Sequence, residues 1–290
     1  MDRMRVRTDL ALEARESFDG SDTEVHGVVV EEEYEEALDL KITRVKILSE
    51  RGAREMGKPV GTYLTMEAPG MAVPDEDYHR EISEALAGCL KELTGENRDR
   101  SVLVAGLGNR DVTPDALGPK TVSNLMITRH LFREYGKETM GMEQASAVSG
   151  IAPGVMAQTG METSEILQGI IDQTSPDILL VIDALAARST RRLGRTIQLT
   201  DTGIQPGSGV GNHRGSLTKE SLGIPVIAIG VPTVVEAAAI IYDAQGSCER
   251  MPPHLNGMFV TPKNIDEIIK QLSFTLSEAL NIAFQISEKA

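Results

Sequence analysis

The stretch that most constrains this chain is residues 101–120, SVLVAGLGNRDVTPDALGPK, where an unbroken apolar run gives way to glycines and then to acids. Such a run is typical of a strand buried on both faces of a parallel sheet. Gly106 and Gly108 then allow a sharp backbone turn. A polar loop with Asp115 follows, and a helical pattern covers residues 122–132. The loop is therefore expected at the carboxyl end of a strand, where open α/β sheets bind their ligands.

Two later stretches repeat this pattern of a buried strand. Residues 177–188, DILLVIDALAAR, read as an apolar strand that ends at Asp183, and residues 224–235, IPVIAIGVPTVV, read as another buried strand followed by glycine and proline. The alternation of buried strands with helical patterns predicts an α/β three-layer sandwich with a mostly parallel or mixed central sheet and insertions. On that fold Asp115 and Asp183 follow the carboxyl ends of two strands and can converge on one cleft.

The remaining pattern divides into half-buried strands and amphipathic helices. Ser49 is expected to cap a short helix that ends near Gly57, and the run of glutamates after residue 30 reads as a solvated face or a guard on a sheet edge. Strands are expected over residues 25–30, 41–48, 60–66 and 145–148, and helices over residues 75–93, from 163 onward and over 264–285.

Charge and composition exclude several functional classes. The chain of 290 residues carries 29 Lys and Arg against 43 Asp and Glu, a net charge of −14 that disfavours direct contact with nucleic acid or anionic lipid. No apolar run approaches the roughly 20 residues that a membrane span needs. Cys89 and Cys248 lack metal or CxxC spacing, and no secretory signal is present, so they read as reduced thiols. We expect a soluble cytoplasmic protein with one domain, although two domains remain possible.

The two aspartates suit hydrolysis. One carboxylate can take a proton from water while the other, kept protonated, gives a proton to the leaving group. Such a pair also needs donors for the developing oxyanion, and the backbone amides around Gly106, Gly108 and Asn109 are candidates. A purely structural role stays open for both acids: Asp115 as a helix N-cap and Asp183 as the start of a turn.

Other chemistries have weaker support. The GLGN run lacks the third glycine of a dinucleotide site, and an aspartate stands at that position, Asp111. Ser208 in the glycine-rich loop 203–215 has neither the strand nor the helix of a nucleophile elbow. The five histidines form no close pair, so a zinc site has weak support. We predict no metal and no cofactor. His213, in the same loop, is the one histidine to consider as a site residue.

Six long motifs stand in order along the chain: VRTDLALEARE, ITRVKILSERGAREMGKPVGTYLTMEAPG, GLGNRDVTPDALGP, VIDALAARS, PGSGVGNHR and IPVIAIGVPTVVEA. Together they resemble the germination protease family of spore-forming bacteria, endopeptidases that degrade small acid-soluble spore proteins. The resemblance implies that Asp115 and Asp183 are catalytic, that the fold is that of hydrogenase maturation peptidases, and that the protein is a homotetramer. In those peptidases the equivalent loops bind nickel, but this sequence has no clear third ligand there.

The same resemblance predicts a role for the N-terminal residues. Members of the family are made as zymogens that remove their own N-terminal arm, and their substrates are cut after the acid in Thr-Glu, then Phe or Ile, then Ala-Ser-Glu. Residues 8–13, TDLALE, follow this order with Asp for Glu and with Leu for Phe or Ile and for Ser. We predict self-cleavage between Asp9 and Leu10, with residues 1–9 as propeptide and residues 10–290 as the peptidase domain, acting in the cytoplasm of the spore core at germination.

Two alternatives remain. The chain can be a metal-sensing maturation peptidase, which metal analysis after chelation would distinguish. It can also be a non-catalytic scaffold that binds spore proteins, in which case Asp115→Asn would leave affinity intact and no cleavage would be seen.

Overall fold

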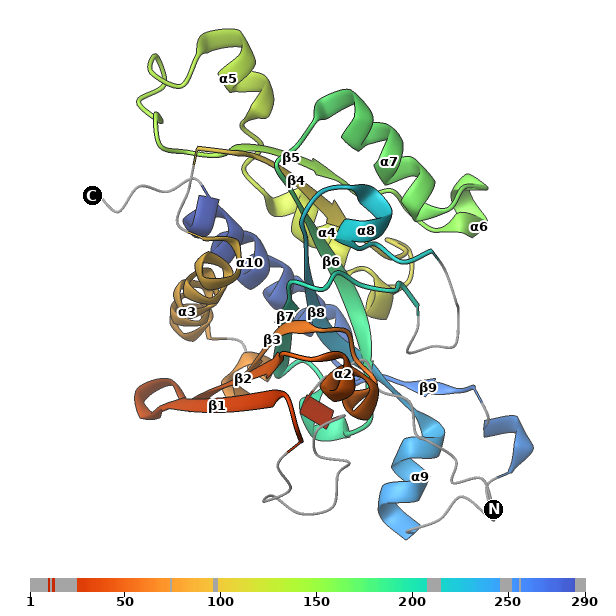
Figure 1. Ribbon diagram of the computed structural model, residues 1–290. Coiled ribbons are helices and arrows are strands. Elements are labelled where there is room, and N and C mark those ends of the chain that lie inside the picture. The colour runs from red at the N-terminus through yellow and green to blue at the C-terminus, as the bar shows by residue number, and fades with distance from the viewer. Residues whose placement is uncertain are drawn as a thin grey trace.

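One twisted β-sheet forms the centre of the molecule (Figure 1). The computed structural model describes residues 10, 12–13, 25–73, 75–95, 99–207, 215–245, 252–255 and 257–284. Within these residues the sheet has nine strands in the order β1-β2-β3-β7-β8-β6-β4-β5, with β9 paired to β8. The strands are β1 Val28–Glu35, β2 Leu40–Ile47, β3 Gly61–Glu67, β4 Ser101–Gly106, β5 Ala147–Ile151, β6 Ile178–Ala187, β7 Thr196–Thr200, β8 Val226–Glu236 and β9 Phe259–Val260.

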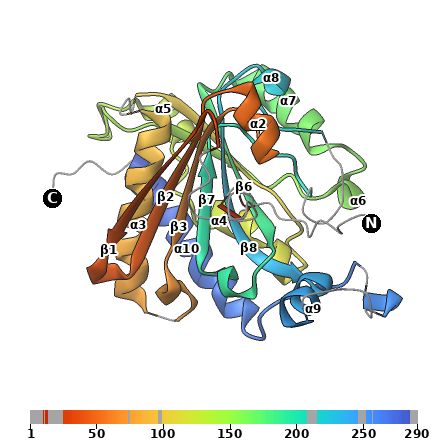
Figure 2. The same ribbon diagram turned by 60° about the horizontal axis from the view of Figure 1, so that its bottom comes forward.

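The sheet is mixed. β4 lies parallel to both β5 and β6, and β6 lies parallel to β8. The run β1-β2-β3-β7-β8 is antiparallel throughout (Figure 2). Because the strands of the parallel part point the same way, their carboxyl ends share one edge, and the loops that follow them can meet there. β1 is the outermost strand at one side of the sheet and carries most of the glutamate run, as a charged edge strand should.

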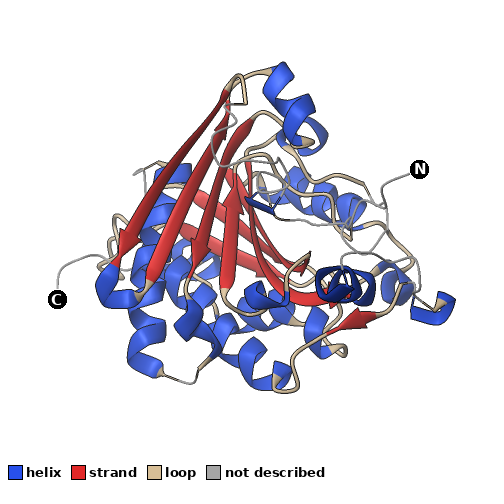
Figure 3. Ribbon diagram, turned by 90° about the horizontal axis from the view of Figure 1, so that it is seen from below, coloured by secondary structure: helices blue, strands red, loops and turns tan. Residues whose placement is uncertain are grey.

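Helices cover both faces of the sheet, which confirms the three-layer α/β architecture (Figure 3). α3, α4 and α10 pack together on one face, and α7 and α8 lie on the other. No helix among the described residues is long and apolar enough to cross a membrane. The helices are α2 Glu50–Met56, α3 Glu76–Thr94, α4 Leu117–Asn124, α5 Arg129–Tyr135, α6 Met156–Thr159, α7 Thr163–Thr174, α8 Lys219–Leu222, α9 Ala237–Gln245 and α10 Ile265–Phe284.

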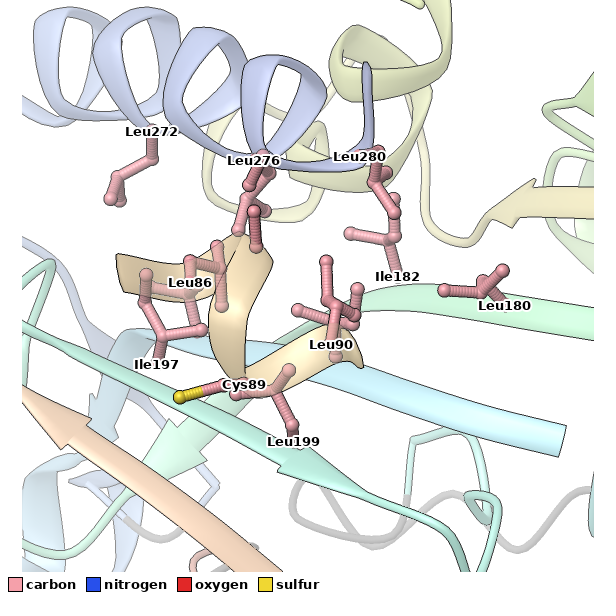
Figure 4. Close-up of a cluster of buried hydrophobic side chains, with 14 of the residues drawn as sticks. Leu86, Cys89, Leu90, Leu180, Ile182, Ile197, Leu199, Leu272, Leu276 and Leu280 are labelled. Carbon is pink, nitrogen blue, oxygen red and sulfur yellow. The ribbon is translucent and has the colours of Figure 1, made fainter. Parts of the chain in front are cut away.

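Strand β6 shows why the apolar runs of this sequence are unbroken. Leu180 and Ile182 are wholly buried in the core beneath α3 and α10 (Figure 4), whereas Leu179 and Val181 are wholly buried on the opposite face. Successive strand residues point to opposite faces, so a strand covered on both sides must be apolar at every position. Burial of each such side chain stabilises the folded protein by about 1.5–3 kcal/mol relative to leaving it exposed to water.

Local signals placed both ends of α2 correctly, and α3 begins next to the residue expected. The Ser49 hydroxyl accepts a hydrogen bond from the Gly52 amide at 3.1 Å, and Gly57 ends α2 with a φ of 63°. The Asp75 carboxylate accepts from the Tyr78 amide at the start of α3. These caps satisfy backbone groups that a helix end leaves without partners.

The structure corrects several sequence expectations. The helical pattern over residues 122–132 is two helices, because Leu125 takes an extended conformation and ends α4. β6 does not end at Asp183 but continues to Ala187, because β8 continues beside it. The glycine and proline expected after β8 lie inside that strand. β7 was missed although its sequence, TIQLT, alternates polar and apolar residues; that pattern predicts a half-exposed strand, whereas all five residues of β7 are buried. β9 and α9 were not anticipated either.

Candidate functional site

Asp183 lies where one of the strands beside β6 stops. The last residue of β4, Gly106, pairs with Ile182, so Asp183 is the first residue of β6 beyond its neighbour. On the other side Asp183 pairs with Gly230 of β8. Its carboxylate accepts a 3.0 Å hydrogen bond from the Ala184 amide, and only 7% of the residue is exposed. Asp183 is therefore held on a rigid strand at the level where the neighbouring strand β4 has ended.

Asp115 comes from the loop that follows β4. It ends a short 3₁₀ helix, Thr113–Asp115, and its carboxylate accepts a 2.7 Å hydrogen bond from the backbone amide of Asn109. The N-cap of α4 is Ala116, so Asp115 does not have the capping role considered as its structural alternative. The carboxylate instead bridges the two ends of its own loop, which holds Asp115 in place.

Three glycines let this loop approach the sheet closely. A Cβ atom on Gly106 would lie 2.1 Å from the Gly118 carbonyl oxygen, and one on Gly118 would lie 2.6 Å from the Ile182 carbonyl oxygen. Gly108 has a φ of +110°, and a Cβ there would lie 2.0 Å from the Asp115 carbonyl oxygen. Only Gly108 therefore has the turn role expected of both glycines in this pair, whereas Gly106 serves close packing. The contacts hold the Asp115 loop against β6.

Both aspartates line one cavity of about 1160 Å³. Its wall includes polar residues from three parts of the chain, among them Gln198 and Thr200 of β7 and Thr218. Lys58, in the turn after α2, is the one basic side chain that the described residues contribute to this wall. Sequence patterns gave no signal for Lys58 or Gln198, because neither lies near the aspartates along the chain.

Tyr63 of β3 also lines the cavity, and its environment favours the neutral phenol. Burial raises the pKa of Tyr63 to about 12, and its hydroxyl donates a 3.0 Å hydrogen bond to the Pro59 carbonyl oxygen. A phenol with such a pKa stays protonated near neutral pH and cannot act as a base there. Asp115 and Asp183 are thus better placed than Tyr63 for proton transfer.

The other expected site residues have different outcomes. The amide of Asn109 is bonded to Asp115 and that of Leu107 to the Ile182 carbonyl, so Gly108 is left as the better oxyanion candidate of this loop. His213 and Asp9 lie outside the described residues. Leu10 is described and is wholly buried. The side chain of Asn109 accepts from Gln158 at 2.9 Å and so ties the loop to α6.

The cavity residues that the structure describes do not provide the ligand set of a metal site. Among the residues that the structure describes, no three His, Cys, Asp or Glu side chains gather closely enough to hold a metal ion. The two aspartates alone do not match the three or more protein ligands that a catalytic transition metal usually has. The described residues of the cavity therefore do not fit a nickel site, and we derive no step through a metal.

Comparison with known proteins gives a consistent result. A family model described as germination protease matches residues 6–246. The germination protease of Caldanaerobacter subterraneus subsp. tengcongensis is 47% identical over 97% of this chain and 94% of its own, and that of Clostridium perfringens (strain ATCC 13124) is 43% identical over 97% and 95%. A solved structure, the [NiFe] hydrogenase maturation protease HycI from Thermococcus kodakarensis KOD1, is similar over 67% of this chain and 99% of its own, with 19% identity and a TM-score of 0.35. The chain belongs to the germination protease family.

Proposed function

We propose that this protein is an endopeptidase that starts the degradation of small acid-soluble spore proteins during germination, with Asp115 and Asp183 as its catalytic pair. The observation that carries this proposal is that both aspartates line one cavity although they come from different segments of the chain. Membership of a family named for germination proteolysis supports the reaction class and the setting, the cytoplasm of the spore core.

The reaction requires two proton transfers. One carboxylate takes a proton from water as the water oxygen bonds to the scissile carbonyl carbon. The carbon–nitrogen bond then breaks, and the other carboxyl group gives its proton to the departing nitrogen. General acid and general base steps each contribute about 10² to 10⁴ in rate. An amide donor such as that of Gly108 would stabilise the charge that develops on the carbonyl oxygen.

The protein is also its own first substrate in this proposal. Cleavage between Asp9 and Leu10 would leave a carboxylate on residue 9 and a new amino group on Leu10, and would convert the zymogen into the mature enzyme. The order of residues 8–13 supports this site. The mature protein is a homotetramer by the same family resemblance, which light scattering would measure.

The deciding experiment uses a purified small acid-soluble spore protein as substrate. Wild-type protein and the Asp183→Asn variant are incubated with it, and the fragments are identified by mass spectrometry. We expect a few defined fragments with wild type, a new N-terminus at Leu10 in the enzyme itself, and neither with the variant. Equal cleavage by Asp183→Asn, or a processed protein that starts elsewhere than Leu10, would contradict the proposal.

A further inference from the structure

Gln198 is a polar residue in the wall of the cavity that the two aspartates line. It lies on β7, the strand between β3 and β8, and only 7% of the residue is exposed. Burial of a carboxamide is costly unless it is hydrogen-bonded, and an aliphatic side chain would fill such a position on a central strand without that cost. The cavity wall therefore has a polar group here that the packing of the sheet does not require.

The sheet register places Gln198 and Asp183 in one row across three strands. Gln198 of β7 pairs with Gly230 of β8, and Gly230 pairs in turn with Asp183 of β6. Residues that lie directly opposite one another in a sheet point to the same face. Because neighbouring strands are about 4.8 Å apart, the Cα atoms of Gln198 and Asp183 are separated by about 9–10 Å. Both residues thus face the same cavity from the same side of the sheet.

No polar side chain stands between these two described residues in the row. Gly230 has no side chain, and a Cβ atom there would lie 2.3 Å from Cδ1 of Leu185, so the Leu185 side chain covers Gly230. Leu185 also lines the cavity. The row therefore presents a polar group on each side of an aliphatic floor.

The neighbour of Gln198 on its other side does not account for its carboxamide. That neighbour is Thr65 of β3, which pairs with Gln198 in the register. Thr65 is wholly buried, and among the described residues its hydroxyl has no hydrogen-bond partner. The Gln198 carboxamide is therefore not bonded to the Thr65 hydroxyl, and no side-chain pair between these two strands explains it.

We propose that Gln198 binds the backbone of the substrate, through hydrogen bonds from its carboxamide to a peptide group about three residues from the scissile bond. This inference rests on the proposed function, which puts the scissile bond at Asp183. An extended chain advances about 3.3 Å per residue, so about three residues span the distance from Asp183 to Gln198. A carboxamide carries both an acceptor and donors, so it can bind the N–H or the C=O of a peptide group. Every residue has a peptide group, so this contact selects an extended chain and not a particular side chain.

The test uses a synthetic peptide with the sequence of residues 3–18 and a series in which one backbone amide at a time, other than the scissile one, is replaced by an ester. Each ester removes one N–H donor and weakens one carbonyl acceptor. With wild type, an ester about three residues from the cut should raise KM about three- to tenfold over the amide peptide. In Gln198→Met, which keeps the length of the side chain but not its amide, this ratio should fall towards one. The ratio of two peptides in one preparation does not depend on how much of the protein is folded.

The kinetic constants of the variants separate binding from structural support. Gln198→Met and Gln198→Asn, whose carboxamide is one methylene shorter, should raise KM for the amide peptide. Both should leave kcat nearly unchanged, because the contact is made equally in the bound substrate and in the transition state. Gln173→Met is the matched control, since it makes the same substitution at an exposed position of α7, and it should change neither constant.

Failure of this inference can be told apart from failure of the proposed function. If wild type cleaves the amide peptide but Gln198→Met has the same KM, or if no ester position responds to that substitution, the inference is overturned and the proposed function stands. A fall in kcat alone would also overturn it. If wild type leaves the amide peptide intact, or if Asp183→Asn cleaves it as well as wild type does, the proposed function fails and the inference fails with it.

Discussion

The backbone amide of Leu107 donates a 2.8 Å hydrogen bond to the carbonyl oxygen of Ile182, the residue before Asp183. This bond joins the first residue after β4 to the strand that carries Asp183. Since Asp115 is bonded in turn to Asn109, two residues after Leu107, the positions of the two acids are coupled through a few backbone hydrogen bonds. The distance between Asp115 and Asp183 therefore depends on how closely the loop after β4 packs against β6.

Gly118→Ala should disrupt this fit. The new Cβ would lie 2.4 Å from the Leu107 carbonyl oxygen and 2.6 Å from that of Ile182, both backbone atoms that cannot move aside easily. We expect the free energy of unfolding to fall by about 1–3 kcal/mol. The rate of peptide cleavage should fall by more than the loss of folded protein accounts for. Urea unfolding and peptide cleavage would measure the two effects.

The matched control for that variant is Gly88→Ala. Gly88 is exposed on α3, and a Cβ there would meet no atom within 4 Å. Alanine favours a helix interior over glycine by about 1 kcal/mol, so this variant should be slightly more stable and fully active. A Gly118→Ala protein that behaved in the same way would show that the close approach is unimportant.

Asp115→Asn should lower kcat by about 10² to 10⁴. The amide oxygen can still accept the hydrogen bond from the Asn109 backbone, so the loop should keep its shape and the melting temperature should change little. Asp111→Asn, an exposed acid of the same loop, is the control and should retain wild-type cleavage. Comparable activity in the two variants would remove Asp115 from the mechanism.

Cys89 should be inert in the folded protein. It is 3% exposed, and burial raises the pKa of its thiol to about 11, so the reactive thiolate is scarce near neutral pH. In a Cys248→Ser background, a thiol reagent should label Cys89 only after denaturant is added. Rapid labelling of the native protein would indicate that α3 opens readily.

His79 should make the protein less stable in acid. Desolvation by burial lowers the pKa of His79 below its ordinary value of 6.5, while its Nδ1 lies 2.7 Å from the Thr275 hydroxyl of α10. Below pH 6.5 the unfolded chain takes up a proton that the folded protein resists, so the free energy of unfolding falls as the pH falls. His79→Gln should reduce this slope in unfolding curves. Parallel slopes for the two proteins would contradict it.

Much of the fold could be predicted because its signals are local. The cap at Ser49 and the glycine at the end of α2 reflect interactions between near neighbours in the chain. The unbroken apolar runs of β4 and β6 reflect strands that are buried on both faces. For β7 the local signal was incomplete: the alternation in TIQLT predicts a half-exposed strand, and only the sheet order, which places β7 between β3 and β8, explains why Gln198 and Thr200 are buried.

The site was only partly predictable for a related reason. Asp115 and Asp183 stand out in the sequence because acids end or interrupt apolar runs. Whether they share a cavity depends on sheet order, since β4 must lie beside β6 and stop one residue short of Asp183. The sequence singled out Glu13 within residues 8–13 but gave no signal for its hydrogen-bond partners, the amides of Arg188 and Ser189, because backbone groups carry no sequence signature.

By itself, then, the sequence determined the alternation of strands and helices, the glycines beside the loop and the identity of the two acids, all of which follow from side-chain chemistry read over a few residues. Tertiary structure alone decided that β6 runs on past Asp183, that Lys58 and Gln198 join the cavity wall, and that Leu10 and Glu13 are buried. The reason is that these contacts join residues far apart in the chain, and their energy depends on packing that no local pattern encodes.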